Sequence, residues 1–206
     1  MFHSRNPAAA AARAHDLVRA LALAGAMALL ALATEAPAQQ VQSPELQKAR
    51  DALAKYKDPL VAVREGYFST VGCVHYKEGA MGVHFLNPAL ISPNVDPEKP
   101  QILVYEPKGD RLELVAAEWF VPLATGVDKR PALFGRPFDG PMAGHEPLMP
   151  AGLHHYDLHV WLFKDNPAGM FATTNPNVSC AKADYALLEE PPPTVPHHGA
   201  GHTPSR

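Results

Sequence analysis

From Gly66 onward, the sequence is a succession of short apolar runs that are separated by turn-forming residues. The runs cover residues 71–76, 81–86, 102–105, 111–121 and 153–163. Alternating apolar and polar residues over such lengths are typical of β-strands. The stretch Pro107-Lys108-Gly109-Asp110 is a typical hairpin turn between two of the runs. The pattern predicts a mainly β fold, with an antiparallel sheet curled into a barrel or arranged as a sandwich.

One helix is expected before this β region. Ser43 is a good capping residue, Pro44 suits the first helical position, and Glu45 places an acid in the first turn. Apolar residues then recur at helical spacing, at Leu46, Ala49, Leu53 and Tyr56. Asp58-Pro59 ends the element. We therefore expect one N-terminal amphipathic helix on the outside of the domain, followed by a second short helix or a strand over residues 60–67.

The two ends of the chain differ in composition from the region between them. Residues 1–38 combine three arginines, an apolar run over residues 20–33 and the pattern Ala36-Pro37-Ala38, which is typical of a signal peptide. The run is shorter than the roughly 20 residues of a spanning helix, although an uncleaved membrane anchor is the alternative. Residues 39–188 are expected to form a single β-rich domain. Residues 189–206 are rich in Pro and His and predict a disordered tail.

These features predict a periplasmic or secreted protein. Removing residues 1–38 takes away three arginines and two acids, which leaves 15 Lys and Arg against 19 Asp and Glu. This balance argues against binding to nucleic acid or, after signal cleavage, to an anionic membrane surface. The signatures of serine hydrolases, dinucleotide-binding proteins and P-loop proteins are absent from the sequence. The oligomeric state is not predicted.

The chain has two cysteines, Cys73 and Cys180. An even number of cysteines in an exported chain predicts a disulfide. A pair of thiolate metal ligands is the alternative, but the sequence has no CxxC motif. A bridge between the two cysteines would close most of the domain into one loop, worth on the order of 4–5 kcal/mol in the chain-entropy model.

Histidines are concentrated in the β-type runs. Five of the six in the domain lie there: His75, His84, His154, His155 and His159. A histidine inside an apolar strand must be neutral, hydrogen-bonded or metal-bound, because burying its charged form without a partner is costly. Several histidines on neighbouring strands can converge on one metal ion. His145 lies in a loop, and His154 points away from its neighbours. The tail histidines are expected to be incidental.

The two-residue period of a strand selects the candidate ligands. His155, Asp157 and His159 share one face of their run, and Glu118 lies on a fourth run beside Trp119. The predicted ligands are His84, Glu118 and His159, with His75 and His155 competing for a further position. Two or three imidazoles with one carboxylate match catalytic Zn²⁺ or the open facial triad of non-haem Fe(II), and Cu and Mn also accept such ligands. Asp157 is a candidate to orient an imidazole. Hydrogen-bonded core histidines and a surface position for Glu118 are the alternatives.

The leading hypothesis is that the chain is an exported, metal-binding, β-barrel-like protein. If it is an enzyme, it would use the metal in a reaction on a small molecule. A non-catalytic periplasmic carrier of a metal or small ligand, and a structural domain without metal, are the alternatives. The sequence does not predict whether the protein is an enzyme. Residues 122–149 form a Pro- and Gly-rich region without a clear period. A region of this length is typical of a lid or a site wall.

Two resemblances accompany these patterns. The stretch GHEPLMPAGLHH, residues 144–155, resembles the second cupin motif, which implies a small metal-binding β-barrel with His155 as a ligand. His159 stands where that motif usually has an asparagine, and the first motif with its HxH pair is missing upstream. The blocks GCVHYKEGAMGVHF and LHVWLFKDNPAGMFATTNPNVSC resemble an uncharacterised group of exported bacterial proteins. This second resemblance implies export and a shared fold, without an activity.

Overall fold

The computed structural model describes residues 43–197. The predicted signal peptide, residues 1–38, lies outside the described residues, as do His198 and His202 of the predicted tail. Within residues 43–197, no helix is both long enough and apolar enough to cross a membrane.

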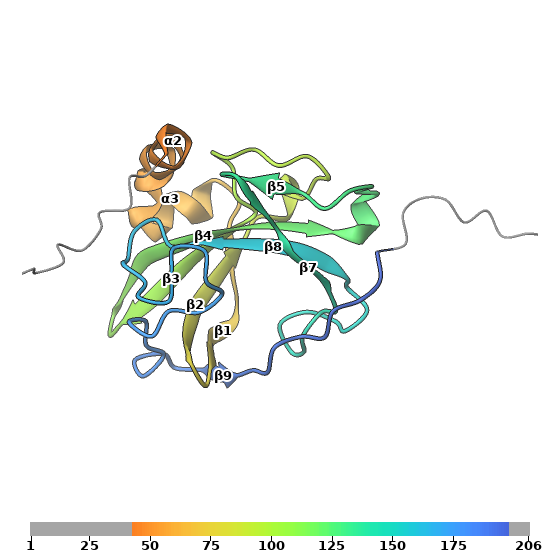
Figure 1. The fold of residues 1–206 in the computed structure, drawn as a ribbon. Coiled ribbons are helices and arrows are strands. Elements are labelled where there is room, and N and C mark those ends of the chain that lie inside the picture. Colours follow the sequence, from red (N-terminus) through yellow and green to blue (C-terminus); the bar gives the residue numbers. More distant parts are fainter. Residues whose placement is uncertain (1–42, 198–206) are drawn as a thin grey trace, which may run out of the picture. The chain divides into compact units, whose positions relative to one another are not determined.

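The N-terminal helix forms as the sequence predicts. Helix α2 spans Pro44–Leu53, and the Ser43 side chain accepts a hydrogen bond from the backbone N–H of Leu46. The 3₁₀ turn η1, Ala54–Lys57, extends it, and a second short helix, α3, spans Pro59–Arg64. Asp58 caps α3 by accepting from the N–H of Leu60. Both helices lie over the outer side of the sheet (Figure 1).

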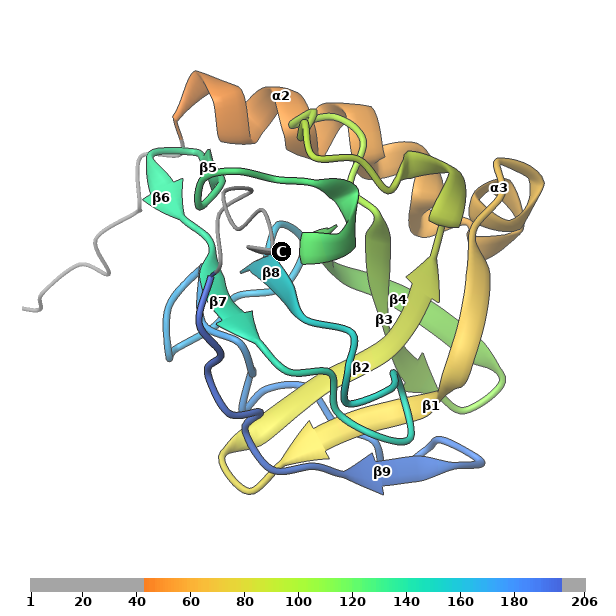
Figure 2. The same cartoon turned by 90° about the vertical axis from the view of Figure 1, so that its right-hand side faces the viewer.

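The remaining structure is a seven-stranded sheet with the strand order β7-β8-β4-β3-β2-β1-β9. Its strands are β1 Phe68–Tyr76, β2 Gly79–Leu86, β3 Ile102–Lys108, β4 Arg111–Pro122, β7 Asp139–Met142, β8 His155–Val160 and β9 Ala186–Leu188. The sheet curls into a half-barrel around a common interior (Figure 2). The prediction of a mainly β fold is confirmed. The sheet is not wholly antiparallel, because β9 runs parallel to β1.

The Pro- and Gly-rich region after β4 contains short regular elements, although its sequence has no clear period. The 3₁₀ turn η3 spans Leu123–Thr125, and β5, Ala132–Leu133, pairs with β6, Arg136–Pro137, as a separate hairpin. β7 then joins the main sheet by pairing with β8. A further 3₁₀ turn, η2, spans Pro88–Leu90 between β2 and β3. The region expected to be a lid or a site wall therefore supplies an edge strand of the half-barrel.

Alternation along the strands divides the side chains between two faces. The convex face packs against α2 and forms the main core, which includes Phe85, Leu103, Trp119 and Leu158. The concave face carries a smaller apolar cluster that includes Ile102, Val104, Ala116, Phe120 and Trp161. Neighbouring residues such as Trp119 and Phe120 therefore lie in different cores, as the two-residue period of a strand requires. The concave face also carries three of the predicted ligands, His84, Glu118 and His159.

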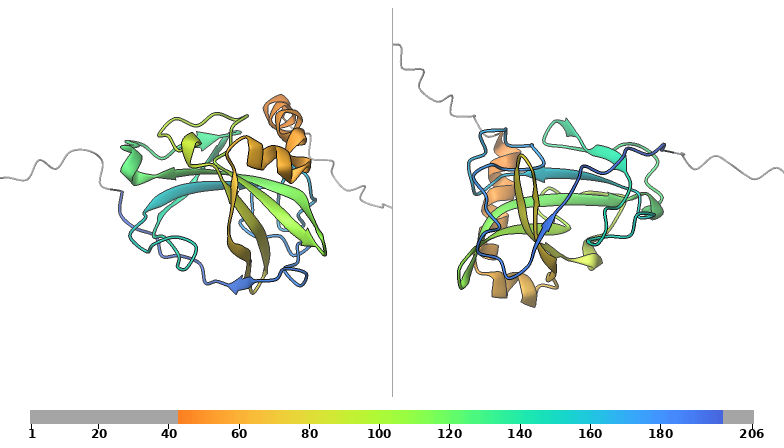
Figure 3. Two further views of the ribbon diagram at one scale, coloured as in Figure 1. Left: turned by 180° about the vertical axis from the view of Figure 1, so that it is seen from behind. Right: turned by 90° about the horizontal axis from the view of Figure 1, so that it is seen from below.

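The C-terminal segment closes the open side of the half-barrel. We call residues 186–197 the C-terminal strap. β9 pairs with β1 at one edge of the sheet, and the N–H of Glu189 donates to the carbonyl of His75. Further along, the N–H of Val195 donates to the carbonyl of Pro141, and the carbonyl of Pro193 accepts from Ala143, at the end of β7 on the other edge. The strap therefore runs from one edge strand to the other (Figure 3).

The prediction that the tail from Glu189 is disordered is wrong for residues 189–197. Glu189 is buried, and the ring of His197 contacts the Tyr156 hydroxyl at 3.0 Å and the Val127 carbonyl at 3.1 Å. The edge strands of an open sheet present unpaired backbone groups. A Pro-rich segment can satisfy these groups with its carbonyls and few remaining N–H groups, without any apolar period in its sequence.

The predicted disulfide is present. Cys73 on β1 is bonded to Cys180, with 5.5 Å between their Cα atoms and a sequence separation of 107. The bond connects β1 to the loop that precedes β9. The disulfide therefore ties this loop to β1, the strand with which β9 of the C-terminal strap pairs.

Candidate metal centre

Three buried side chains converge on the concave face of the sheet: His84 from β2, Glu118 from β4 and His159 from β8. The Nε2 atom of His159 lies 3.2 Å from Oε2 of Glu118, and the Nε2 atom of His84 lies 3.4 Å from the same oxygen. The two imidazole rings are nearly perpendicular, with 6.4 Å between their centroids. One carboxylate oxygen therefore stands between two imidazole nitrogens.

Two different features of the sheet produce this arrangement. Glu118 and His159 are direct partners in the antiparallel β4–β8 ladder, so their side chains lie on the same face close together. His84 is on β2, which is separated from β4 by β3. On a flat sheet β2 and β4 would be about 10 Å apart. The curl of the half-barrel brings the His84 side chain across the interior to Glu118.

The buried polar atoms of this cluster lack hydrogen bonds. Among the described residues, Oε2 of Glu118, both ring nitrogens of His159 and Nδ1 of His84 have no hydrogen-bond partner. The contacts between the imidazoles and the carboxylate are short but do not have hydrogen-bond geometry. A buried carboxylate without a hydrogen bond or counter-charge is strongly unfavourable. The cluster therefore requires a cation at its centre or a proton on an imidazole.

The pKa shifts of His159 and Glu118 favour a proton on an imidazole when no cation is bound. Burial by itself lowers the pKa of His159, but the Glu118 carboxylate outweighs it and raises that pKa to about 9. Burial raises the pKa of Glu118, but the charge of His159 outweighs burial and holds the pKa below its usual value, with a smaller contribution from His84. A proton on His159 thus compensates the carboxylate when no metal is bound. Only one of the two imidazoles is needed for that role.

The interatomic distances also fit a metal ion. Two ligand atoms that are each about 2.1 Å from a tetrahedral ion lie about 3.4 Å apart. The observed separations from Oε2 of Glu118, 3.2 and 3.4 Å, agree with this value. One ligand atom from each of the three residues lies within 4.8 Å of the others. Two nitrogens and one oxygen form a donor set that Zn²⁺ and the first-row divalent ions accept.

The structure does not bring His75 to this cluster. On β1 the inward-facing side chains are Val74 and Tyr76, which form a small apolar group with Met81. His75 shares the outward face with Cys73 and lines a hollow on the outer surface together with Cys180. The sequence correctly places His75 and Cys73 on one face of the strand. It does not reveal that this face is the outer one.

His155 is buried on the concave face, as predicted, but it is not part of the cluster. It precedes His159 by four residues on β8, a distance of about 13 Å along a strand. Its Nδ1 atom donates to the carbonyl of Leu153 at 3.0 Å. Its Nε2 atom lies 3.7 Å from the carboxylate of Asp157 and has no hydrogen-bond partner among the described residues. Asp157 therefore lies next to His155 rather than orienting a ligand imidazole.

A second histidine–carboxylate pair was missed from the sequence. His145, in the loop after β7, contacts Glu189 of the C-terminal strap at 2.5 Å between Nδ1 and Oε2. The hydroxyl of Tyr76 donates to the same carboxylate oxygen at 3.3 Å. The only local signal is the apolar triplet Ala186–Leu188 directly before Glu189, which is compatible with a short edge strand.

The cluster of His84, Glu118 and His159 lies beside a small cavity. This cavity has a volume of about 240 Å³, and His84 and Glu118 form part of its wall. A neighbouring cavity of about 420 Å³ shares Met81, His145 and Asp157 with it and extends to the strap. A molecule in the smaller cavity would therefore be in direct contact with two of the three candidate ligands.

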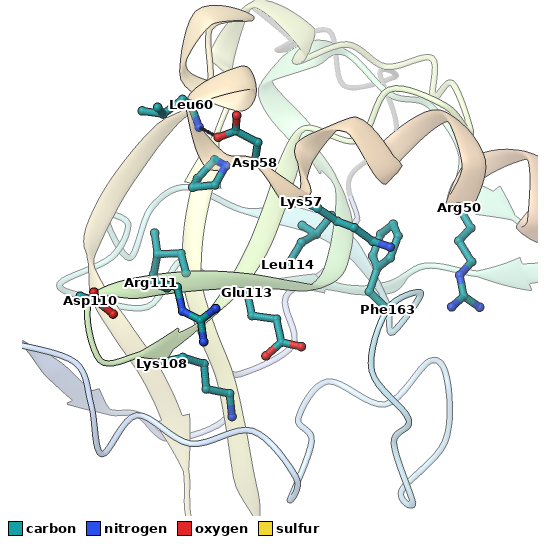
Figure 4. Close-up of a pocket in the computed structure, with 12 residues that line it drawn as sticks. Arg50, Lys57, Asp58, Leu60, Lys108, Asp110, Arg111, Glu113, Leu114 and Phe163 are labelled. Carbon is teal, nitrogen blue, oxygen red and sulfur yellow. Dashed lines mark hydrogen bonds between the residues drawn. The ribbon is translucent and has the colours of Figure 1, made fainter.

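A further hollow of the described residues lies elsewhere on the molecule. It has a volume of about 790 Å³ and lies between η1, α3 and the β3–β4 hairpin (Figure 4). Its charged groups have mixed signs, and Arg50 and Lys57 lie over the ring of Phe163, at 5.9 and 5.6 Å from its centroid. None of the three candidate ligands lines this outer hollow. The chemistry of the concave face is therefore separate from it.

No protein-family model matches this sequence, and neither the curated proteins nor the solved structures include a match to it. The two resemblances described above, to cupins and to exported bacterial proteins, therefore stay predictions. What the structure defines is a class: a curled β half-barrel with a disulfide and a buried His/Glu/His cluster that could hold a metal ion.

Proposed function

We propose that this protein binds one divalent transition-metal ion through His84, Glu118 and His159, and that the ion is its functional centre. The observation that carries the proposal is the position of the Glu118 carboxylate. It is 3% exposed, and its Oε2 atom has no hydrogen bond and lies within 3.4 Å of two imidazole nitrogens.

A metal ion satisfies this cluster better than a proton does. A proton on His159 compensates the charge of Glu118, but it leaves His84 without a role and the carboxylate without a well-formed hydrogen bond. A divalent ion would bind one oxygen and two neutral nitrogens at once. Both the type of the ligand atoms and the distances between them suit Zn, Fe, Mn or Cu. Carboxylate-only sites, which suit Ca²⁺ and Mg²⁺, have a different donor set.

A three-residue ligand set supports a reactive centre over a storage site. Structural and storage sites are usually closed by four protein ligands, whereas catalytic sites leave a position for water or substrate. Within residues 43–197, no fourth His, Cys, Asp or Glu belongs to the cluster. The cavity beside His84 and Glu118 gives a small molecule access to the open position. There the ion would act as a Lewis acid or activate a bound oxygen ligand, and a non-catalytic metal carrier is the second candidate.

Export is part of the same proposal. The pattern of residues 1–38 is that of a signal peptide, and disulfides persist in oxidising compartments. The bond between Cys73 and Cys180 is compatible with the periplasm or with secretion.

The test is a metal-loading experiment on the mature protein, residues 39–206. The protein is stripped with a chelator and then offered Zn, Fe, Mn and Cu, and bound metal is quantified by mass spectrometry. We expect one ion per chain. The variants His84→Asn, Glu118→Gln and His159→Asn should each weaken binding by more than about 100-fold, since ligand loss exceeds the effect of losing an outer partner.

Two matched variants serve as controls. His75→Asn removes a strand histidine on the outer face, and His155→Asn removes a buried histidine at the far end of β8. Both should retain stoichiometric metal with nearly unchanged affinity. The proposal is contradicted if none of the four metals binds stoichiometrically. It is also contradicted if His75→Asn loses as much metal affinity as the ligand variants do.

A further inference from the structure

We propose that the cavity beside the metal centre binds a small monocarboxylate whose apolar part is about the size of one phenyl ring. The carboxylate would occupy the open position on the ion, and the apolar part would fill the cavity. This inference rests on the proposed metal binding and names the class of ligand that the site accepts.

The size of the ligand follows from the volume of the cavity. A cavity of about 150 Å³ lined by aliphatic and aromatic side chains accommodates benzene. The cavity beside His84 and Glu118 measures about 240 Å³. It therefore has room for a ring or a branched chain of similar size together with one carboxylate group. On the same scale, a fused or linked double ring that also carries a carboxylate needs more than this volume.

The apolar character of the ligand follows from the walls. Most of the cavity lining is aliphatic, aromatic or thioether surface, with contributions from Met81, Ile102, Phe120, Leu148, Met149 and Leu153. These residues come from β2, β3, β4 and the loop before β8, so separate segments form the walls of the cavity. Polar parts of a ligand would lose hydrogen bonds to water against such walls. A ring or branched chain would gain free energy by leaving water.

The charge of the ligand follows from the metal centre. A divalent ion bound to Glu118 and two neutral imidazoles keeps one net positive charge, which favours an anionic oxygen ligand at the open position. The hydroxyl of Thr70 lines the same cavity and is buried without a hydrogen-bond partner among the described residues. It is available to donate to a bound carboxylate. The carboxylate of Asp157 is also in the wall, and it disfavours a second negative charge on the ligand.

The test uses Co²⁺-loaded protein, whose visible absorption reports on ligands that bind to the ion. Acetate, benzoate, phthalate and 4-biphenylcarboxylate are titrated, first with and then without the metal. We expect benzoate to bind roughly 30-fold tighter than acetate, which is the effect of burying a phenyl ring. Phthalate and 4-biphenylcarboxylate should bind more weakly than benzoate. Benzoate should not bind the metal-free protein.

Cavity-filling variants separate the ligand site from the metal site. Met149→Trp and Ile91→Trp place a large ring in the cavity from two different segments. Each should weaken benzoate binding at least tenfold while Co²⁺ affinity, the control for correct folding, is retained. Leu60→Trp, on the exposed surface of α3, is the matched control and should bind benzoate normally.

The outcomes distinguish this inference from the metal proposal. If Co²⁺ binds but benzoate is no tighter than acetate, or the two cavity-filling variants bind benzoate normally, the ligand class is wrong and the metal site stands. Tighter binding of phthalate or 4-biphenylcarboxylate overturns the limits on charge or size. If no metal binds, the proposed function itself fails, and the metal-anchored ligand fails with it.

Discussion

Glu118 and His159 are directly opposed in the β4–β8 ladder, and their Oε2 and Nε2 atoms lie 3.2 Å apart in the interior of the half-barrel. This pair is fixed by local strand pairing, because opposed residues in an antiparallel ladder have neighbouring side chains. His84 reaches the same oxygen from β2, across the curl of the sheet. Two of the candidate ligands are thus held by one ladder, and the third depends on the curvature of the whole domain.

Metal binding should stabilise the folded protein. An ion that binds only the folded state adds about 2.7 kcal/mol at a free concentration of 100 times its Kd. For a domain of this size the melting temperature should rise by roughly 5–10 °C. Thermal unfolding with and without the preferred ion measures the shift, and EDTA should reverse it. Glu118→Gln should abolish the rise, whereas His75→Asn should preserve it.

Acid should destabilise the protein through Glu106, whose buried carboxylate accepts from Lys108, from Lys164 and from the backbone of Ser179. Burial raises the pKa of Glu106, but the hydrogen bonds from Lys108 and Lys164 outweigh it and hold the pKa below its usual value. The carboxylate therefore contributes stability above about pH 4.3, the ordinary pKa of Glu, and loses it as the pH falls toward the lower pKa of the folded state.

The variant Glu106→Gln isolates this contribution. At pH 7 it should lower the free energy of unfolding by about 2 kcal/mol, since hydrogen bonds to charged groups are lost. Its stability should also fall less than that of the wild type between pH 5 and pH 3. Glu113→Gln is the matched control, because Glu113 is opposite Glu106 in the β3–β4 ladder but exposed. Urea unfolding at several pH values gives the comparison, and equal pH profiles for wild type and Glu106→Gln would refute the prediction.

Loss of the disulfide should strongly destabilise the domain. The bond between Cys73 and Cys180 closes a loop of 107 residues, which corresponds to about 5 kcal/mol in the chain-entropy model. The double variant Cys73→Ala, Cys180→Ala should unfold at a much lower urea concentration than the oxidised wild type. Reduced wild type should behave like the double variant. A difference below about 1 kcal/mol would show that the loop is already restricted in the unfolded chain.

The C-terminal strap should depend on Glu189. Replacing it with Ala leaves the buried side chain of Tyr76 and the half-buried side chain of His145 without their acceptor, which should cost about 2 kcal/mol. Hydrogen exchange at Val195 and Ala143, whose N–H groups join the strap to the end of β7, should become faster. Glu190→Ala, an exposed neighbour of the same type, should have nearly wild-type stability. Equal exchange rates in the two variants would mean that Glu189 does not hold the strap.

Much of the local structure was predictable from the sequence. The Ser43 cap and Pro44 start α2 as expected, the β-type runs correspond to strands β1, β2, β3, β4 and β8, and the two cysteines form a disulfide. The three residues that converge, His84, Glu118 and His159, are those that strand alternation selected first. The helix and strand predictions depend on neighbouring residues along the chain, whose conformational preferences act within a few residues.

The tertiary structure alone decided the remaining points. Alternation determines which residues share a face, but only packing against α2 determines which face is convex, and this removes His75 from the site. Pairing between distant strands and the curl of the sheet set the positions of His155 and His84. Residues 189–195 pair with both sheet edges through backbone groups. Because every sequence has such groups, the pairing leaves no signal in the amino-acid sequence. The sequence therefore determined the strands and the candidate ligands, and the non-local pairing of those strands decided which ligands meet.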